Sequence, residues 1–142
     1  MSLATEARAG LLSRCTLFLG LDADGLAALA ERAAEVDFPA SHVIARQGEI
    51  GTGLFIVVSG AVRVVRSGEL IARLGSGDFF GELSVLDRMP RTASVIADEP
   101  TRCLALASWD FEATVAASPP IALAIMRGLA RRLRERTETD RH

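Results

Sequence analysis

The stretch DFFGELSVLDRMPRTASV, residues 78–95, decides how the rest of this 142-residue chain is interpreted. Gly81 lets a backbone approach closely, and the residues after it can form only a turn or two of helix before Pro90. The first amides of a short helix lack partners within the helix, and Arg91 follows Glu82 by nine residues. Such amides, together with a guanidinium whose rigid donor fork suits phosphate, predict an anion site.

Glu82 is the informative residue of this pattern. A carboxylate beside a phosphate would repel it, so we expect Glu82 to accept a hydrogen bond from a hydroxyl group of the same ligand. A ligand with both a phosphate and a sugar hydroxyl is a nucleotide. Each residue alone has a plainer explanation: a turn glycine at Gly81, a charge favoured by the helix dipole at Glu82, and a solvated strand edge at Arg91. The joint pattern favours the nucleotide site.

The same residues resemble the phosphate-binding cassette of the cyclic nucleotide-binding domain family. Its members include the catabolite activator protein, the regulatory subunit of cAMP-dependent protein kinase and cyclic nucleotide-gated channels. The resemblance implies that Glu82 holds the ribose 2′-hydroxyl, that Arg91 holds the cyclic phosphate, and that amides after the glutamate complete the site. The step from Glu82 to Arg91 is similar to that of the kinase and channel members, and one residue shorter than in the catabolite activator protein. The matching residues are Gly81, Glu82, Leu83, Ser84, Arg91 and Thr92.

The resemblance implies further ligand contacts outside the cassette. Val64, Ile71 and Leu74 are expected around the purine. In the last helix, Arg132 is expected to pair with Glu82, while Arg136 and Thr137 lie beside the base. Thr92 leaves base selectivity open, because its hydroxyl suits guanine but threonine also occurs in cAMP binders. We expect cAMP as the ligand, with cGMP as the alternative, and no metal.

The fold class predicted from the pattern is α+β. Short strand-like runs separated by Gly, Pro, Ser and Asp turns occupy residues 35–107, with the cassette at 78–92, and predict an antiparallel β-roll of the jelly-roll type. Helical periodicity marks N-terminal helices within 1–34 and two C-terminal helices within 108–137, so we expect one domain over 1–142. The expected strands are Val36–Phe38, Val43–Arg46, Leu54–Val58, Val62–Arg66, Leu70–Leu74, Ala93–Ala97 and Arg102–Ala107.

Capping residues and prolines mark where the helices begin. Asp22 is expected to cap the second helix and Ser108 the first of the C-terminal pair, while Pro119-Pro120 forms a corner before a last helix at about Ile121 to Thr137. That last helix carries an apolar stripe, which either packs on the roll or forms a dimer seam with a second copy. The stripe comprises Ile125, Leu129 and Leu133.

Composition narrows the remaining possibilities. Hydrophobic residues make up 49% and charged residues 24%, which is typical of a globular protein. No apolar run approaches the about 18 residues that a membrane span needs, and the N-terminus does not resemble a signal peptide, so we expect a cytoplasmic protein with no membrane segment. Cys15 and Cys103 are expected to be reduced packing residues, and His42 is isolated from other metal-binding residue types.

Three classes of function compete: a sensor of a cyclic nucleotide, a domain of the same fold that serves another effector or a protein partner, and an enzyme. The enzyme is disfavoured because no nucleophile–base pair or metal cluster can be assembled. The net charge of −2 gives no general nucleic-acid signal, and the six arginines of residues 121–142 suit a helix C-terminus. We expect no DNA-binding region in this chain. We therefore expect a stand-alone regulatory sensor or part of a larger regulator, channel or transporter.

Overall fold

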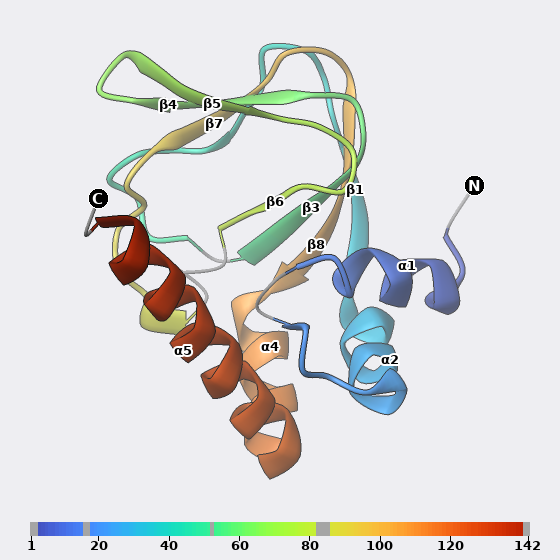
Figure 1. Ribbon diagram of the computed structural model, residues 1–142. Helices are drawn as coiled ribbons and strands as arrows, with labels where there is room; N and C mark the ends of the chain where they lie inside the picture. The colour runs from blue at the N-terminus through green and yellow to red at the C-terminus, as the bar shows by residue number, and fades with distance from the viewer. Residues whose placement is uncertain (1–2, 16–17, 52, 82–85, 141–142) are drawn as a thin grey trace.

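The computed structural model describes residues 3–15, 18–51, 53–81 and 86–140, without the side chains of 132 and 136–140. Figure 1 shows a β-roll with the helices packed against one end of it. The strands lie in two antiparallel sheets, with the orders β1-β8-β3-β6 and β2-β7-β4-β5. This arrangement confirms the predicted fold class. The strands are β1 (Ala34–Phe38), β2 (Val43–Ala45), β3 (Gly53–Ser59), β4 (Val62–Arg66), β5 (Glu69–Leu74), β6 (Phe79–Phe80), β7 (Ser94–Ala97) and β8 (Thr101–Ala107).

The inner strands of sheet β1-β8-β3-β6, which are β3 and β8, bury both of their faces. Along β3, Leu54 and Ile56 belong to the core cluster shared with the helices, whereas Val57 belongs to the cluster inside the roll. The same division occurs along β8, where Leu104 faces the helices and Cys103 faces the roll interior. Successive side chains of a strand point to opposite faces, so an uninterrupted apolar run is what a sheet covered on both sides requires.

The four described helices form the outer layer over this sheet. They are α1 (Thr5–Leu12), α2 (Ala23–Arg32), α4 (Ser108–Ala117) and α5 (Pro119–Asp140). Their buried side chains meet in the first core cluster, where the rings of Phe18 and Phe111 lie 6.2 Å apart. The Asp22 carboxylate accepts a hydrogen bond from the Gly25 amide at 2.8 Å, which confirms the predicted N-cap of α2.

Two other element boundaries differ from the prediction. Ser108 is the first residue of α4 rather than its cap, because Ala107 holds the N-cap position in an extended conformation without a side-chain hydrogen bond. Helix α5 begins at Pro119, where proline's missing N–H costs no helical hydrogen bond, and the Ser118 hydroxyl accepts from the Ile121 amide at 3.4 Å. The two-residue strand β6 was not predicted, since two residues carry no periodic signal.

The turn between β4 and β5 lies at Ser67 and Gly68, residue types that are common in turns. Ser67 and Gly68 both have positive φ, 52° and 80°, and join β4 to β5 in a two-residue hairpin that pairs Arg66 with Glu69. Left-handed conformations at both central residues match the right-handed twist of the flanking strands. A side chain also holds this turn, because the Gln47 carboxamide oxygen accepts from the Ser67 amide at 2.8 Å.

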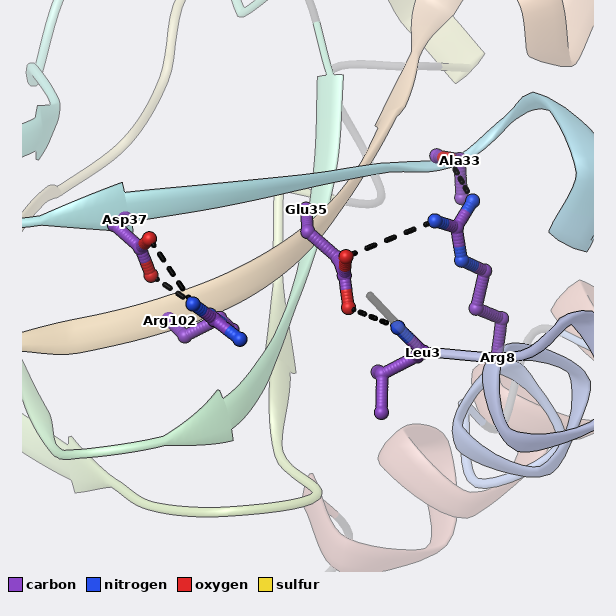
Figure 2. Close-up of polar contacts among 6 residues, drawn as sticks. All are labelled: Leu3, Arg8, Ala33, Glu35, Asp37 and Arg102. Carbon is purple, nitrogen blue, oxygen red and sulfur yellow. Dashed lines mark hydrogen bonds and ion pairs between the residues drawn. The ribbon is translucent and has the colours of Figure 1, made fainter. Parts of the chain in front are cut away.

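Polar contacts attach α1 to the start of the roll (Figure 2). The Leu3 amide donates to Glu35 at 2.6 Å, and the Arg8 guanidinium donates to the Ala33 carbonyl at 2.6 Å. Further along β1, Asp37 and its register partner on β8, Arg102, form a hydrogen-bonded ion pair at 2.8 Å. The Arg102 N–H groups lower the pKa of the Asp37 carboxyl. These contacts tie the first helix to β1, and β1 to its neighbour β8.

The described helices fall short of a membrane-spanning helix in length or in hydropathy. No single helix in the described part of the chain is long and apolar enough to span a membrane. Helices α4 and α5 reach the required length and hydropathy only as a pair, which bends by 116° between Ala117 and Pro119.

Candidate functional site

Backbone hydrogen bonds hold the Arg91 main chain in place. The Arg91 amide donates to the Glu49 carbonyl at 2.8 Å, and the Arg91 carbonyl accepts from the Gly48 amide at 2.9 Å. The preceding residue, Pro90, forms a β-bridge with Ile50. The end of the cassette is therefore paired with the loop between β2 and β3, and this pairing fixes where the Arg91 side chain begins.

The Arg91 guanidinium lies in a slot formed by glycine backbone. Its Nη2 donates to the Gly53 carbonyl at 3.1 Å. A Cβ added to Gly51 would lie 2.5 Å from the guanidinium carbon, and one added to Gly81 would lie 2.7 Å from Nη1. Gly81 also has a φ of +86°, which side-chain-bearing residues rarely adopt. We call Gly51, Gly53 and Gly81 the glycine slot; it sets the direction of the guanidinium.

A cavity of about 160 Å³ lies beside this guanidinium. Its lining includes two arginines, Arg46 and Arg91, against one acidic residue, Glu49, a balance that favours an anionic ligand. The ring of Phe55 also lines it and stacks on Phe80 with centroids 5.1 Å apart. The other lining residues are Val43, Ile44, Ala45, Ile50 and Gly51. Two arginines, one carboxylate and one aromatic ring thus line the same cavity.

Of the other predicted cassette residues, the structure describes Thr92 but not Glu82, Leu83 or Ser84. Thr92 is exposed, and its carbonyl accepts a hydrogen bond from Arg66 Nε at 3.3 Å. Glu82, Leu83 and Ser84 lie outside the described residues. The structure therefore brings together Gly81 and Arg91, and the predicted ribose contact at Glu82 stays a prediction.

The three apolar residues expected around the purine do not share one environment. Val64 and Leu74 pack against the cluster inside the roll. Ile71 lies where the register between β4 and β5 shifts, and 47% of its surface is exposed. A bulge inserts an unpaired residue and interrupts the alternation of faces, so the sequence pattern alone cannot assign the face of Ile71.

The remaining predicted ligand contacts belong to α5. The backbone of Arg132, Arg136 and Thr137 is helical, whereas their side chains lie outside the described part of the structure. One further titratable group lies in the roll: burial raises the pKa of the Cys103 thiol to about 12, so this thiol stays protonated and takes no part in charge recognition. Among the described residues, no group of three His, Cys, Asp or Glu side chains is arranged to hold a metal ion.

Sequence reasoning missed Gly51, Gly53 and the cavity residues of the loop after β2. The signal was available in part, because two glycines in Gly51-Thr-Gly53 ahead of an apolar strand mark a close backbone approach. The group that approaches these glycines is the guanidinium of Arg91, about 40 residues later in the chain. No local sequence pattern predicts that contact.

Comparison with known proteins agrees with this geometry. The sequence profile of the cyclic nucleotide-binding domain family matches residues 35–118. The CRP-like cAMP-activated global transcriptional regulator of Mycobacterium tuberculosis is 35% identical over 129 residues, which cover 87% of this chain and 58% of the relative. The Cyclic AMP receptor protein of Thermus thermophilus is 41% identical over 103 residues, which cover 69% of this chain and 48% of the relative.

A solved structure is similar over nearly the whole chain. The N-terminal domain of a transcriptional regulator from Streptomyces coelicolor A3(2) has a TM-score of 0.83 at 31% identity, and the match covers 91% of this chain and 94% of that one. The chain therefore belongs to the cyclic nucleotide-binding domain family. It spans 58% and 48% of the lengths of the two relatives above, which extend beyond the matched region.

The glycine slot makes a prediction about stability. We expect Gly81→Ala to lower the free energy of unfolding by about 1–3 kcal/mol, because a Cβ would meet the Gly53 carbonyl oxygen at 2.7 Å in a left-handed backbone conformation. Gly75→Ala is the matched control, since nothing lies within 4 Å of its added Cβ. Urea denaturation of both variants measures the difference. Equal stabilities for the two alanine variants would contradict the steric argument.

Proposed function

We propose that this chain is a regulatory ligand-binding module that binds a cyclic purine nucleotide in the pocket beneath residues 81–92. The observation that carries the proposal is the Arg91 guanidinium, held by the Gly53 carbonyl and the glycine slot at the edge of the cavity in the roll. A pre-oriented guanidinium loses little freedom on binding, and its fork of donors suits two phosphate oxygens. Membership of the family supports the same ligand class.

The proposed pose divides the nucleotide among three groups of residues. Arg91 binds the cyclic phosphate, with the amides of Glu82, Leu83 and Ser84 completing the site. The Glu82 carboxylate accepts a hydrogen bond from the ribose 2′-hydroxyl. Val64 and Leu74, which pack at the inner cluster, together with Ile71 contact the purine. This pose follows the family resemblance. It places the positive charge of Arg91 on the phosphate and the carboxylate of Glu82 on a hydroxyl donor.

We propose cAMP rather than cGMP as the physiological ligand. The names of the two relatives described above, a cAMP-activated regulator and a Cyclic AMP receptor protein, support this preference. The apolar side chains expected around the purine contact its faces and do not distinguish the two bases. Thr92, exposed in the structure, is the residue whose hydroxyl would favour guanine if cGMP were the ligand.

The proposed role is regulatory and cytoplasmic rather than catalytic. The domain over residues 1–142 would report occupancy to another part of its protein or to a partner. The alternative function is an effector or protein-interaction domain of a transcription regulator or transporter that does not respond to cyclic nucleotides. An oriented Arg91 next to a cavity favours the nucleotide sensor, because a purely structural arginine has no need of an adjoining cavity.

Binding itself is the first test. We expect calorimetry with the purified protein to show binding of cAMP, with 5′-AMP much weaker, and Arg91→Ala to lose about 2–3 kcal/mol of affinity through a lost charge-assisted contact. Glu82→Ala should lose less, since one neutral hydroxyl donor is involved. Arg73→Ala is the control, because this arginine pairs with Asp98 at 3.1 Å on the outside of the roll.

Two outcomes would contradict these proposals separately. No heat and no thermal shift with millimolar cAMP or cGMP would exclude the cyclic nucleotide sensor and favour the alternative effector domain. A competition titration in which cGMP binds tenfold tighter than cAMP would keep the sensor and reverse the choice of base.

We propose that α5 relays occupancy by closing over the bound nucleotide. In this proposal Arg132 pairs with Glu82, while Arg136 and Thr137 contact the base. Figure 1 shows that α5 starts at the bend after α4 and runs along one side of the roll. The C-terminal half of α5 extends beyond the other labelled helices. A ligand that contacts α5 in only one of two arrangements shifts the equilibrium toward that arrangement.

Hydrogen exchange tests the relay. We expect added cAMP to slow amide exchange in residues 121–137 as well as in 81–92, because helix α5 gains contacts through its C-terminal half. Exchange is measured with and without cAMP, and Arg91→Ala under the same conditions supplies the unliganded control. Protection confined to residues 81–92 would mean that the cassette alone holds the nucleotide.

We also propose a homodimer through α5, with a seam different from the stripe read from the sequence. Ile125 is buried in the protein's own core and Leu129 packs against it, so these two residues are occupied within the domain. Leu133 is 66% exposed. Together with exposed Leu123, Met126 and Ala130, it forms a second stripe at alternating spacings of three and four residues, as in a coiled coil.

Sedimentation velocity tests this seam. We expect the wild-type chain to dimerise at micromolar concentration and Met126→Glu with Leu133→Glu to be monomeric, because two charges would enter the apolar stripe of each copy. Arg131→Glu, on an exposed position outside the stripe, is the control. A wild-type chain that stays monomeric at every concentration would contradict the proposal.

A further inference from the structure

Arg46 and Glu49 occupy the two ends of one tight turn that follows β2. The Glu49 amide donates to the Arg46 carbonyl at 3.2 Å, which is the hydrogen bond that closes a β-turn. Gly48, the third residue of the turn, has a φ of +87°, a left-handed conformation that glycine adopts readily. The turn therefore places a positive and a negative residue next to each other.

The same turn is fastened to the end of the cassette. The Arg91 amide donates to the Glu49 carbonyl at 2.8 Å, and the Arg91 carbonyl accepts from the Gly48 amide at 2.9 Å. The Gln47 amide donates to the Ser94 hydroxyl, also at 2.9 Å. These hydrogen bonds fix the turn relative to Arg91, so the backbone positions from which its two charged side chains start are set.

Both charged residues of the turn line the cavity beside Arg91. Both are exposed, and neither forms an ion pair within the part of the chain that the structure describes. Their charges are therefore not neutralised by contact and act on the cavity through space. Together with Arg91, they give the described lining of the cavity one net positive charge.

We infer that Arg46 and Glu49 are specificity-determining residues, which adapt the cavity to the charge of the ligand's phosphate. The inference rests on the proposed function, because this phosphate is the one that Arg91 is proposed to bind. The cyclic phosphate of cAMP is a diester with one negative charge, whereas the monoester of 5′-AMP carries nearly two at neutral pH. One net positive charge in the lining balances the cyclic ester but not the monoester.

Coulomb's law gives the two residues opposite effects that differ in size between the two esters. A fixed charge acts on a dianion with twice the energy that it has on a monoanion at the same place. Glu49 therefore weakens binding of the monoester more than binding of the cyclic ester, while Arg46 strengthens binding of the monoester more. For each substitution, the change in log Kd for 5′-AMP should be about twice the change for cAMP.

The competing explanation is a pair of solvated surface charges with no part in recognition. Exposed charges are screened by salt and contribute little to stability. A lower affinity after one substitution does not exclude this explanation, because any change in net charge alters the attraction of an anion. The ratio of the two nucleotide affinities, compared with the ratio after charge changes elsewhere on the surface, separates the two explanations.

Calorimetric titration with cAMP, and displacement of cAMP by 5′-AMP, measures that ratio. At about pH 8 the monoester is a dianion, since its second pKa is about 6. We expect Glu49→Gln to tighten binding of cAMP by about two- to threefold and of 5′-AMP by about four- to ninefold, and Arg46→Gln to weaken each by the same factors. The double substitution restores the net charge of the lining and should restore the wild-type ratio. Glu82 is the same in all these proteins, so its contribution cancels.

Three further variants serve as controls. Arg46→Lys keeps the positive charge and should keep the wild-type ratio. Arg73→Gln, beside Asp98 on the outside of the roll, and Glu31→Gln, at an exposed position of α2, change the net charge away from the cavity and should leave the ratio unchanged. The effects of the substitutions at Arg46 and Glu49 should shrink at about 1 M salt, where the Debye length is about 3 Å.

The outcomes separate this inference from the proposed function. If wild type binds cAMP but the substitutions at Arg46 and Glu49 change both affinities by the same factor, the inference is overturned and the proposed function stands. Arg46→Lys with the ratio of Arg46→Gln, or distant controls that alter the ratio equally, would overturn it as well. If wild type binds no cyclic nucleotide, the proposed function fails and the inference fails with it.

Discussion

The structure depends on two neighbouring strands, β3 and β8, that bury both of their faces. In β3, Leu54 and Ile56 face the helices while Phe55 and Val57 face the interior of the roll. A shift of one residue in the register with β8 would exchange these two sets. The helices cover the face of β3 that carries Leu54 and Ile56, and the second sheet covers the face that carries Val57. The cavity beside Arg91 is lined by β2, by Phe55 of β3 and by the loop that joins these two strands.

A charged side chain can lie in such an environment only if its hydrogen-bonding groups have partners there. Arg91 meets this requirement through the Gly53 carbonyl and through backbone that comes close because Gly51 and Gly81 carry no side chains. The same contacts orient the guanidinium before any ligand arrives. The stability predicted to depend on Gly81 and the proposed recognition of an anion therefore rely on the same few backbone atoms.

Helix α4 connects the two parts of the molecule that a sensor has to couple. Phe111 anchors it in the core shared with the sheet, while Asp110 and Glu112 reach α2 and the cassette. Helix α5 follows after a sharp bend and buries Ile125 against the same core. This arrangement leaves a single packed helix between the ligand site and the segment proposed to relay occupancy.

The sequence by itself determined the features that depend on neighbouring residues. The Asp22 cap, the Ser67-Gly68 hairpin and the short strands themselves are local, because each follows from the conformational preferences of a few consecutive residues. Only the tertiary structure decided which segments meet. The contact of Arg91 with Gly53 joins positions 38 residues apart, and the ion pair of Arg88 with Glu112 joins positions 24 apart. Such pairs form because the packed sheet and helices bring distant segments together, a constraint that local preferences do not encode.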